Sequence, residues 1–446
     1  MRKAAVTLAI TCAAGLTLTG CRGVATAPEL QARGESERVG EILESHRHYP
    51  ESLTSDSGLE QLLRFAMLNQ PRVEAAYYDW AASVERITLA RSLPDPRLTF
   101  ESDIADIVMT VMPGLMQEFP GPGKLKAAAR VARAESRVKY FAFESAVLQT
   151  ALDLKRSFYN LHFLEEKIRI NRKTFGLLGD LEKIARAQNQ VGRASLQDVY
   201  RTQIEQDQLA TEIANLEDSR RPLLAQLKGA LGLTHDQPAP PVPACPESTA
   251  LELNGDDLFA TGIARNPRLK AMSAEVRMAE AGIAMATKTQ VPDFSLGLMT
   301  DLKAAPVMFR PLAGMTLPIW RDKIAAQIAQ AQAGKRAAEA RLNSEQILLA
   351  VDYAMKSYDY REVTRNLALL QHQLIPKARQ SLELARSGYL SGTIDFFNLI
   401  DAERTLLNFE LADVEARTRR EIILSELSLL IAGVPPAGAP VLNSNP

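Results

Sequence analysis

The sequence contains little cysteine, few aromatic residues and no excess of charge of either sign. Its three cysteines, one of them inside an N-terminal apolar run, exclude a disulfide framework. Aromatic residues make up 6% of the 446 residues, whereas alanine, leucine and glutamine are plentiful, which favours long helices packed at close spacing. The 52 basic and 53 acidic residues nearly cancel, so the composition gives no indication of a nucleic-acid partner.

Continuous apolar runs are confined to the N-terminus. Two basic residues follow the initiator methionine, and the apolar run that starts at Ala4 ends in Leu-Thr-Gly-Cys at Cys21. The run is too short and wrongly flanked for a spanning helix, so it predicts a signal peptide over residues 1–20. Leu-Thr-Gly-Cys resembles the bacterial lipobox, which implies that the mature chain begins at Cys21 and carries lipid there; an ordinary signal peptide is the alternative. Arg22 in place of an aspartate favours delivery to the outer membrane.

Two near-copies of one turn lie 200 residues apart, at Gly192 and Gly392. The register holds upstream without a gap, because ARAQNQVG at 185–192 matches ARSGYLSG at 385–392. This period is far longer than the ~20–50 residues of a solenoid unit. Each copy is therefore expected to form one complete structural half.

The duplication divides the mature chain into two repeats and three connecting segments. Repeat 1 is expected over 58–234 and repeat 2 over 255–434, with a proline-rich linker between them at 235–254. Residues 21–57 are polar and are expected to form an extended or poorly ordered arm, and residues 435–446 a C-terminal tail.

Each repeat shows the same order of predicted elements. A modest helix, interrupted early at Asn/Gln-Pro-Arg, is followed by alternating apolar and polar residues that predict one β-hairpin. The two hairpins are expected to reverse near Met112–Gly114 and near Ala305-Pro306. A helix of 67 residues follows, Lys124–Gln190 in repeat 1 and Lys323–Tyr389 in repeat 2, each roughly 100 Å long. The glycine turn and a return helix complete the repeat, so the fold class is mainly α with a small β component.

Helix-weakening residues occupy equivalent places in the two long helices. Gly176 and Pro376 each lie 16 residues before the turn glycine of their repeat. Proline removes a backbone donor and glycine loosens a helix by up to ~1 kcal/mol relative to alanine. We therefore predict helix breaks at both residues, acting either as hinges or as points of local curvature.

No motif assembles a catalytic or metal site. Gly-Pro-Gly-Lys at 121–124 lacks the first glycine and the Ser/Thr of a phosphate-binding loop. His46-Arg47-His48 has no cysteine or carboxylate at ligand spacing and is expected on the solvated arm. We expect neither an enzyme nor a cofactor.

The whole order, from the lipobox to the duplicated hairpins, resembles the TolC-like outer-membrane efflux factors over nearly the entire mature chain. The most specific segments are Gly192–Val199, Gly392–Ala402 and QEFPGPGKL at Gln117–Leu125. The resemblance implies a homotrimer whose twelve strands close a barrel in the outer membrane and whose twelve helices continue it as a tunnel through the periplasm. It also implies a periplasmic adaptor and an inner-membrane pump as partners. The implied function is the passive exit duct of a tripartite efflux pump for small molecules or metal ions in a Gram-negative cell.

Two points remain open at the level of sequence. Each predicted hairpin has room for strands of about 10 residues and a minimal loop, near the ~9–11 that a membrane strand needs. The barrel is therefore expected to be shortened or incomplete, with the lipid on Cys21 bearing more of the anchoring. The alternative function is a lipid-anchored, non-conducting periplasmic coiled-coil structural or adaptor protein.

The turns at Gly192 and Gly392 define the candidate periplasmic tips. Ser195 is a favourable N-cap and Asp198 completes a capping-box pattern with it, while Asp395 is the equivalent N-cap in repeat 2, with Asn398 at its N3 position. By the resemblance, Asn398 and Asp401 match positions where the family carries tip aspartates that face the pore and act as a cation filter. Phe396 and Phe397 are expected to add an apolar plug.

Overall fold

The computed structural model describes the chain from residue 25 onward, with gaps. The described residues are 25–49, 52–54, 57–105, 108–238, 240–241, 260, 262–301, 306–434, 439 and 441–442. Cys21 and most of the predicted linker lie outside them, so the lipidation of Cys21 stays a prediction. The chain divides into two compact units: unit 1 comprises 1–38, 80–137 and 274–338, and unit 2 comprises 39–79, 138–273 and 339–446.

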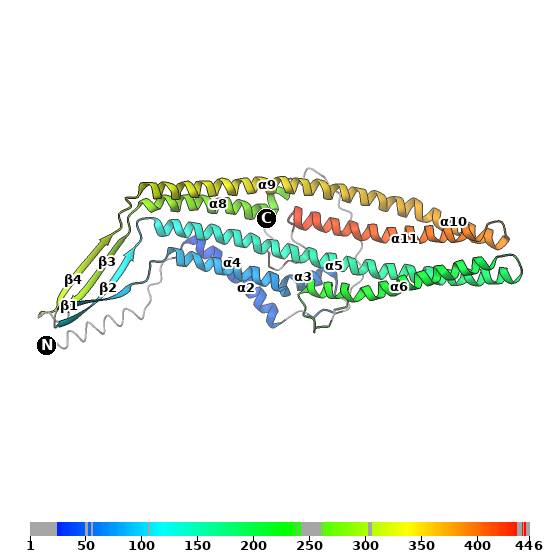
Figure 1. Cartoon of the computed structure of the whole chain (residues 1–446), viewed down its shortest axis with the longest axis horizontal. Coiled ribbons are helices and arrows are strands. Elements are labelled where there is room, and N and C mark those ends of the chain that lie inside the picture. The colour runs from blue at the N-terminus through cyan, green and yellow to red at the C-terminus, as the bar shows by residue number, and fades with distance from the viewer. Residues whose placement is uncertain are drawn as a thin grey trace. The chain divides into compact units, whose positions relative to one another are not determined.

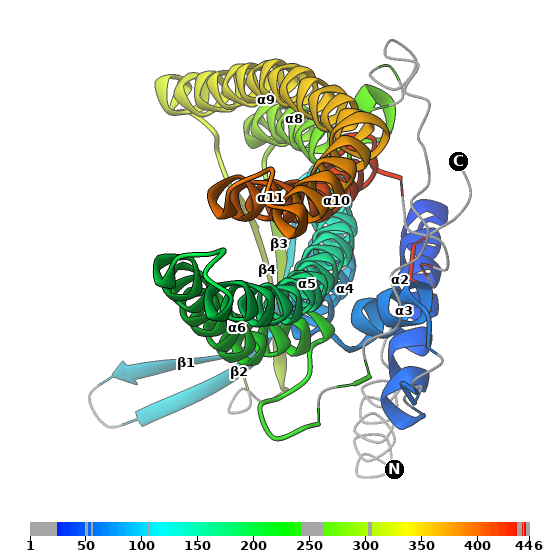
Figure 2. The same cartoon turned by 90° about the vertical axis from the view of Figure 1, so that its right-hand side faces the viewer.

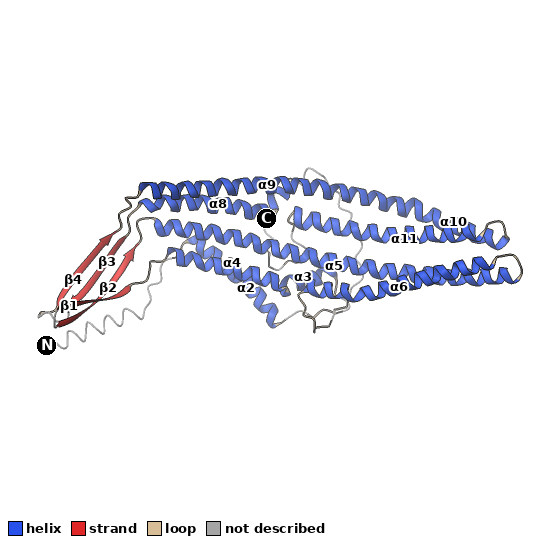
Figure 3. Ribbon diagram, in the orientation of Figure 1, coloured by secondary structure: helices blue, strands red, loops and turns tan. Residues whose placement is uncertain are grey.

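The predicted order of elements is confirmed in both repeats (Figures 1 and 3). An additional helix, α2 (Ala27–His48), precedes them. Repeat 1 contains α3 (Leu59–Asn69), α4 (Pro71–Arg91), β1 (Arg97–Ala105), β2 (Val108–Phe119), α5 (Lys124–Gln190) and α6 (Leu196–Leu231). Repeat 2 contains α8 (Pro267–Thr287), the 3₁₀ turn η1 (Lys288–Gln290), β3 (Phe294–Asp301), β4 (Met308–Met315), α9 (Arg321–Leu369), the π-helical segment η2 (Leu370–Leu374), α10 (Ile375–Ser391), α11 (Phe396–Ser425) and the π-helical segment η3 (Glu426–Ile431).

The Asn/Gln-Pro-Arg motif ends one helix and secures another in each repeat. In repeat 1 it separates α3 from α4, and the Asn69 side-chain amide donates to the carbonyls of Leu231 and Gly232 at the end of α6. In repeat 2 the Asn266 amide donates to the carbonyls of Leu430 and Ile431 at 2.7 and 3.2 Å. Gln70, the repeat equivalent of Asn266, likewise donates to the Gly229 and Ala230 carbonyls. In both repeats, an amide beside this proline thus satisfies the last carbonyls of the return helix, which have no partner within that helix.

The four strands form one antiparallel sheet in unit 1, in the order β1-β2-β3-β4. The register pairs Leu98 with Leu115, Leu115 with Leu298, and Leu296 with Ala313. Each repeat thus contributes one hairpin, and β2 and β3 join the two repeats.

The expected reversal at Met112–Gly114 is wrong. These residues lie inside β2, and the chain turns between Ala105 and Val108 instead. Pro113 is tolerated because the β2–β3 pairing starts only at Gly114, so at Pro113 the strand has a partner on one side alone. The second reversal lies between Asp301 and Met308, as expected.

The expected extended arm is helical, since α2 covers 22 of its residues. Its buried positions are Glu29, Ser36, Val39 and His46, which fall on one face of a helix. Three of these four side chains are polar, so the usual apolar stripe is missing. Pro28 lies in the first turn, where a helix accommodates proline, and the segment to His48 contains no other proline.

A break at Gly176 is also wrong, because α5 is continuous from Lys124 to Gln190. Glycine keeps its backbone N–H, so it weakens the helix without removing a hydrogen bond. The proline in repeat 2 has a different effect: the π-helical segment η2 directly precedes the turn that contains Pro376. Whether either residue acts as a hinge stays a prediction.

Gly176→Ala is expected to raise the free energy of unfolding by up to ~1 kcal/mol. A Cβ at this position meets no atom within 4 Å, so the gain in helix propensity is not offset by a clash. The midpoint of urea denaturation, followed by circular dichroism, measures the change. A lower midpoint would show that the glycine is needed for a bend.

No helix in the described part of the chain combines the length and the apolar character needed to cross a membrane.

Candidate functional site

The sheet of unit 1 carries a continuous row of apolar side chains on one face. The register brings them onto this face because paired residues of neighbouring strands point to the same side. Seven of them are between 42% and 67% exposed: Leu98, Phe100, Leu115, Phe294, Leu296, Leu298 and Met315. Apolar side chains gathered at this density on an exposed surface are typical of contact with a membrane or with another chain.

The opposite face of the same sheet carries charged side chains among apolar ones such as Met299 and Leu312. It carries an ion pair between Arg97 and Glu118 at 3.3 Å and another between Arg310 and Asp301 at 3.8 Å. The strands therefore place these charged side chains on one face of the sheet and none among the seven exposed apolar residues of the other.

A charged junction joins the two repeats where the sheet meets the long helices. The Asp293 carboxylate, just before β3, accepts hydrogen bonds from the Gly121 N–H at 2.7 Å and from Lys124 Nζ at 2.7 and 2.8 Å. Burial raises the pKa of Asp293, but the hydrogen bonds from Lys124 and Gly121 outweigh it and hold that pKa below its usual value. A Cβ at Gly121 would lie 2.2 Å from the carbonyl oxygen of Pro292. The close packing at Gly121 and the hydrogen bonds to Asp293 thus connect the segment 117–125 of repeat 1 with the segment 291–294 of repeat 2.

The two predicted tip turns lie in unit 2 and share one backbone geometry. Gly192 and Gly392 have φ angles of +74° and +80°. In repeat 1 the Arg193 N–H reaches the Gln188 carbonyl, and in repeat 2 Thr393 reaches Gly388. These are Schellman motifs, which end a helix with a left-handed residue and favour glycine there.

The return helices begin with the predicted caps. Ser195 and Asp198 form a capping box at the start of α6, and the Asp395 side chain accepts from the Asn398 N–H at 2.9 Å at the start of α11. Capping therefore accounts for Ser195, Asp198 and Asp395 without any role in transport.

The helical hairpins α5–α6 and α10–α11 lie next to each other (Figure 2). They share a buried core near the tips. Phe396 is 2% exposed and packs edge-to-face on Tyr389 at 5.2 Å, so the prediction that it forms a plug is wrong. Phe397 remains 56% exposed, with the Arg201 guanidinium 5.0 Å from its ring centre. Asn398 and Asp401 are both exposed on α11, and their place in a pore stays a prediction.

A hollow of about 200 Å³ between the two hairpins contains a glutamate that sequence reasoning missed. Glu403 on α11 is 3% exposed and lines this hollow together with Glu205 and Glu212 of α6. Burial, reinforced by the charge of Glu410, raises the pKa of Glu403 to about 7, although Lys173 opposes the rise. The neighbouring acids are neutralised, Glu205 by Arg404 and Glu212 by Lys167.

A second missed cluster joins the repeats around Glu426 in η3. This buried carboxylate pairs with Arg156 of α5 and, at 2.6 Å, with Lys356 of α9. Burial raises the pKa of Glu426, but hydrogen bonds from Lys356 and Arg156 hold it below its usual value overall. Arg156 and Lys356 are equivalent residues of the two repeats, whereas repeat 1 has Gln226 where repeat 2 has Glu426.

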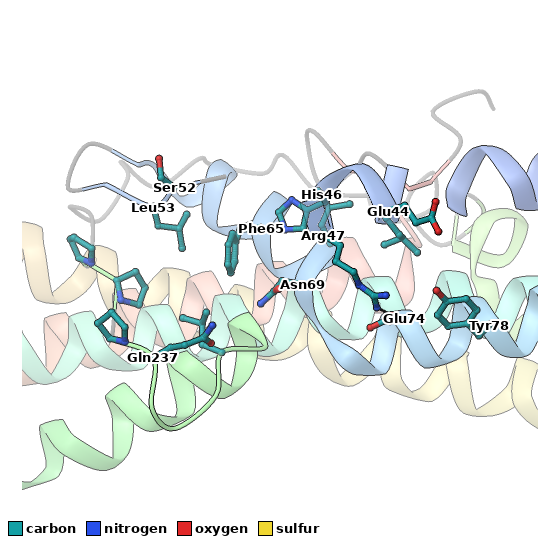
Figure 4. Close-up of a pocket in the computed structure, with 16 residues that line it drawn as sticks. Glu44, His46, Arg47, Ser52, Leu53, Phe65, Asn69, Glu74, Tyr78 and Gln237 are labelled. Carbon is teal, nitrogen blue, oxygen red and sulfur yellow. Dashed lines mark hydrogen bonds and ion pairs between the residues drawn. The ribbon is translucent and has the colours of Figure 1, made fainter. Parts of the chain in front are cut away.

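A hollow of about 610 Å³ in unit 2 lies beside α2 (Figure 4). Arg47 pairs with Glu74 of α4 on its floor, and His46 is buried edge-to-face against Phe65 at 5.6 Å. His46 is thus a packing residue, which corrects the expectation of a solvated arm. Across the described residues, no three metal-ligating side chains gather.

Comparison with known proteins gives matches over most of the chain. Residues 261–433 match the family described as Outer membrane efflux protein. The chain is therefore similar to that family over its second repeat. The cobalt-zinc-cadmium resistance protein CzcC of Cupriavidus metallidurans is 23% identical over 376 residues, covering 80% of this chain and 86% of CzcC.

Solved outer-membrane channels share the fold. The channel OprN superposes with a TM-score of 0.74 at 16% identity, covering 84% of this chain and 90% of OprN. VceC from Vibrio cholerae gives 0.72 at 15% identity, covering 84% of this chain and 96% of VceC. The predicted resemblance to the outer-membrane efflux factors is confirmed.

Proposed function

We propose that this outer-membrane efflux protein is the exit duct of a tripartite efflux pump. It resides in the outer membrane, extends into the periplasm and passes its cargo without an energy source of its own. The observation that carries the proposal is the difference between the two faces of the sheet. The exposed apolar face suits lipid, and the other face, which carries the Arg97–Glu118 pair, can meet water.

The working assembly would be a homotrimer that meets a periplasmic adaptor and an inner-membrane pump. Four strands and two long helical hairpins per chain supply the parts for a closed trimer, in which each chain forms one third of the wall. The helical tips at Gly192 and Gly392 would face the adaptor.

The cargo class that the comparisons favour is a metal ion. CzcC is named for resistance to cobalt, zinc and cadmium, and its match covers both repeats. Within the described residues no metal-binding cluster is found, which is compatible with a duct that conducts ions without holding them.

Alkaline extraction tests this function against that of a peripheral lipoprotein. A variant exported by a non-lipoprotein signal peptide, with Cys21→Ala, carries no lipid anchor. If the sheet enters the membrane, this variant stays in the pellet at high pH. Its complete release, with wild-type protein retained, would show that the lipid alone holds the protein and would overturn the proposal.

Lipidation of Cys21 is expected to place acyl chains on the first residue of the mature protein. A single chain anchors only marginally, so the two or three chains of a bacterial lipoprotein are needed for stable binding. Mass spectrometry of the purified N-terminal peptide measures this. An unmodified N-terminus at another residue would contradict it, and Cys245→Ser is the matched control that leaves the modification intact.

Asp401→Ala is expected to lower the cation selectivity of the reconstituted channel and its block by divalent cations. Three Asp401 carboxylates about 8 Å apart repel by only ~0.5 kcal/mol per pair in water, so they would filter ions without preventing assembly. Reversal potentials in a salt gradient measure the effect, with Asp395→Asn as a control at the neighbouring cap. Unchanged selectivity would remove Asp401 from the pore.

A further inference from the structure

A short segment of repeat 2 exposes bulky apolar side chains where the sheet ends and a long helix begins. It runs from Leu317 to Lys323, from the end of β4 into the first turn of α9 (Figure 1). Leu317, Ile319 and Trp320 are 64%, 66% and 71% exposed. The backbone here is fixed, because the Ile324 N–H donates to the Trp320 carbonyl at 3.2 Å. The exposure of Trp320 is therefore built into the start of the helix.

The equivalent segment of repeat 1 consists of small residues and shows which positions a junction covers. FPGPG at 119–123 stands where repeat 2 has LPIWR at 317–321. Gly121 is buried against the backbone of repeat 2, whereas Pro122, the counterpart of Trp320, remains exposed. The Trp320 position thus lies outside the contact that the repeats make with each other. A protein contact of the same kind at repeat 2 would leave the tryptophan uncovered.

Two cations follow the tryptophan, and the stability of the helix does not account for them. Arg321 and Lys323 lie in the first turn of α9, where the helix dipole disfavours positive charge. Both are exposed, and within the described part of the chain neither side chain forms an ion pair. Together with Ile319, Trp320 and Asp322 they line a hollow of about 690 Å³. The hollow therefore combines apolar surface with an excess of positive charge.

We propose that this hollow binds the headgroup of an anionic phospholipid, with Arg321 and Lys323 against the phosphate and Trp320 at the boundary between headgroups and acyl chains. Tryptophan is enriched at that boundary, and arginine forms strong charged hydrogen bonds with phosphate. The site continues the exposed apolar face of the sheet, because Met315 at the end of β4 belongs to that face. The inference rests on the proposed function, since it takes that face to lie in the membrane.

Fluorescence quenching tests the position of Trp320 in the full-length protein, reconstituted into vesicles of phosphatidylethanolamine and phosphatidylglycerol. The chain has two tryptophans and Trp80 is buried, so Trp80→Phe leaves Trp320 as the only emitter. Lipids brominated near the headgroup are expected to quench it roughly twofold or more above lipids brominated at the chain end. If Trp80→Phe fails to assemble, subtracting the emission of Trp320→Phe from that of the wild type gives the same signal.

Three results of this experiment would overturn the lipid site. Quenching by aqueous acrylamide alone would place Trp320 in water, and quenching by neither reagent would place it under a second copy. Equal or stronger quenching by lipids brominated at the chain end would place it in the hydrocarbon. The proposed function is read separately, because protein that resists alkaline extraction while Trp320 stays in water would keep the duct and reject the lipid site.

Brominated phosphatidylglycerol and phosphatidylcholine, compared at the same low fraction of the vesicle lipid, test the two cations. The anionic lipid is expected to quench Trp320 roughly threefold more than the zwitterionic one, and Arg321→Ala with Lys323→Ala to remove this preference. Arg336→Ala, at an exposed arginine further along α9, is the matched control and should keep it. A preference that is absent from the parent protein, or that survives in the double variant, would overturn the headgroup contact.

Discussion

Glu403→Gln is expected to stabilise the protein above pH 7 and to have little effect at pH 4. Glu403 is buried between the two helical hairpins, and its pKa is raised from 4.5 to about 7, first by burial and then by the charge of Glu410. As the pH rises through 4.5, the unfolded chain releases this proton while the folded chain retains it. Stability is therefore lost between about pH 4.5 and pH 7 and stays at the lower level above that range.

The glutamine resembles the protonated carboxyl in shape and carries no charge at any pH. The gain from Glu403→Gln should approach ~3 kcal/mol at pH 8, because each unit of pKa is worth ~1.4 kcal/mol. Urea denaturation of the variant and the wild type at several pH values gives the difference. Glu415→Gln, an exposed glutamate on the same helix, is the control and should change little. A gain that does not vary with pH would show that folding does not raise the pKa of Glu403.

The raised pKa of Glu403 also predicts how the contact between the two helical hairpins depends on pH. Glu403 comes from repeat 2, and the carboxylates around it, Glu205 and Glu212, come from repeat 1. Ionisation of Glu403 would add a third negative charge to this hollow, where Arg404 and Lys167 already pair with Glu205 and Glu212. Raising the pH through 7 should therefore loosen the contact between the two hairpins.

Glu426→Gln is expected to destabilise the protein by about 2 kcal/mol near neutral pH. The change removes the negative charge that pairs with both Arg156 and Lys356. Charged hydrogen bonds contribute more than neutral ones, but the two cations are 43% and 37% exposed, and water offsets part of their loss.

The pH dependence of this variant should run opposite to that of Glu403→Gln. The hydrogen bonds from Lys356 and Arg156 lower the pKa of Glu426 despite its burial. The pair therefore stabilises the fold fully above about pH 4.5 and less as the pH falls through the lower folded pKa. Gln226→Ala, at the equivalent exposed position of α6, is the control and should cost under ~0.5 kcal/mol. If Glu426→Gln lowers the free energy of unfolding by the same amount at pH 3 as at pH 7, the shape of the side chain and not its charge would account for the stabilisation.

Local signals in the sequence predicted the helical part of the fold well. The bounds of α5, the turns at Gly192 and Gly392 and the caps at Ser195 and Asp395 follow from the residues at those positions alone. The duplication strengthened each of these predictions, because a turn sequence that recurs 200 residues later in the same register is not expected by chance.

The features that sequence reasoning missed depend on contacts between distant segments. The helix α2 buries Glu29, whose carboxylate is held by Arg91 of α4, so its buried face does not look apolar in sequence. The Glu426 cluster joins residues 270 positions apart. Pro113 looks like a turn residue until the uneven lengths of β2 and β3 are known. In each case the structure at the residue depends on a segment far away in the sequence, which the local sequence pattern does not reveal.

The most direct test of the central claim is the conductance of the purified protein in a planar lipid bilayer. A trimeric duct is expected to give discrete current steps, with conductance that rises with salt concentration and with selectivity that changes in Asp401→Ala. Intact trimers that insert into the bilayer and pass no current at any voltage or pH would contradict the claim that this protein is an exit duct.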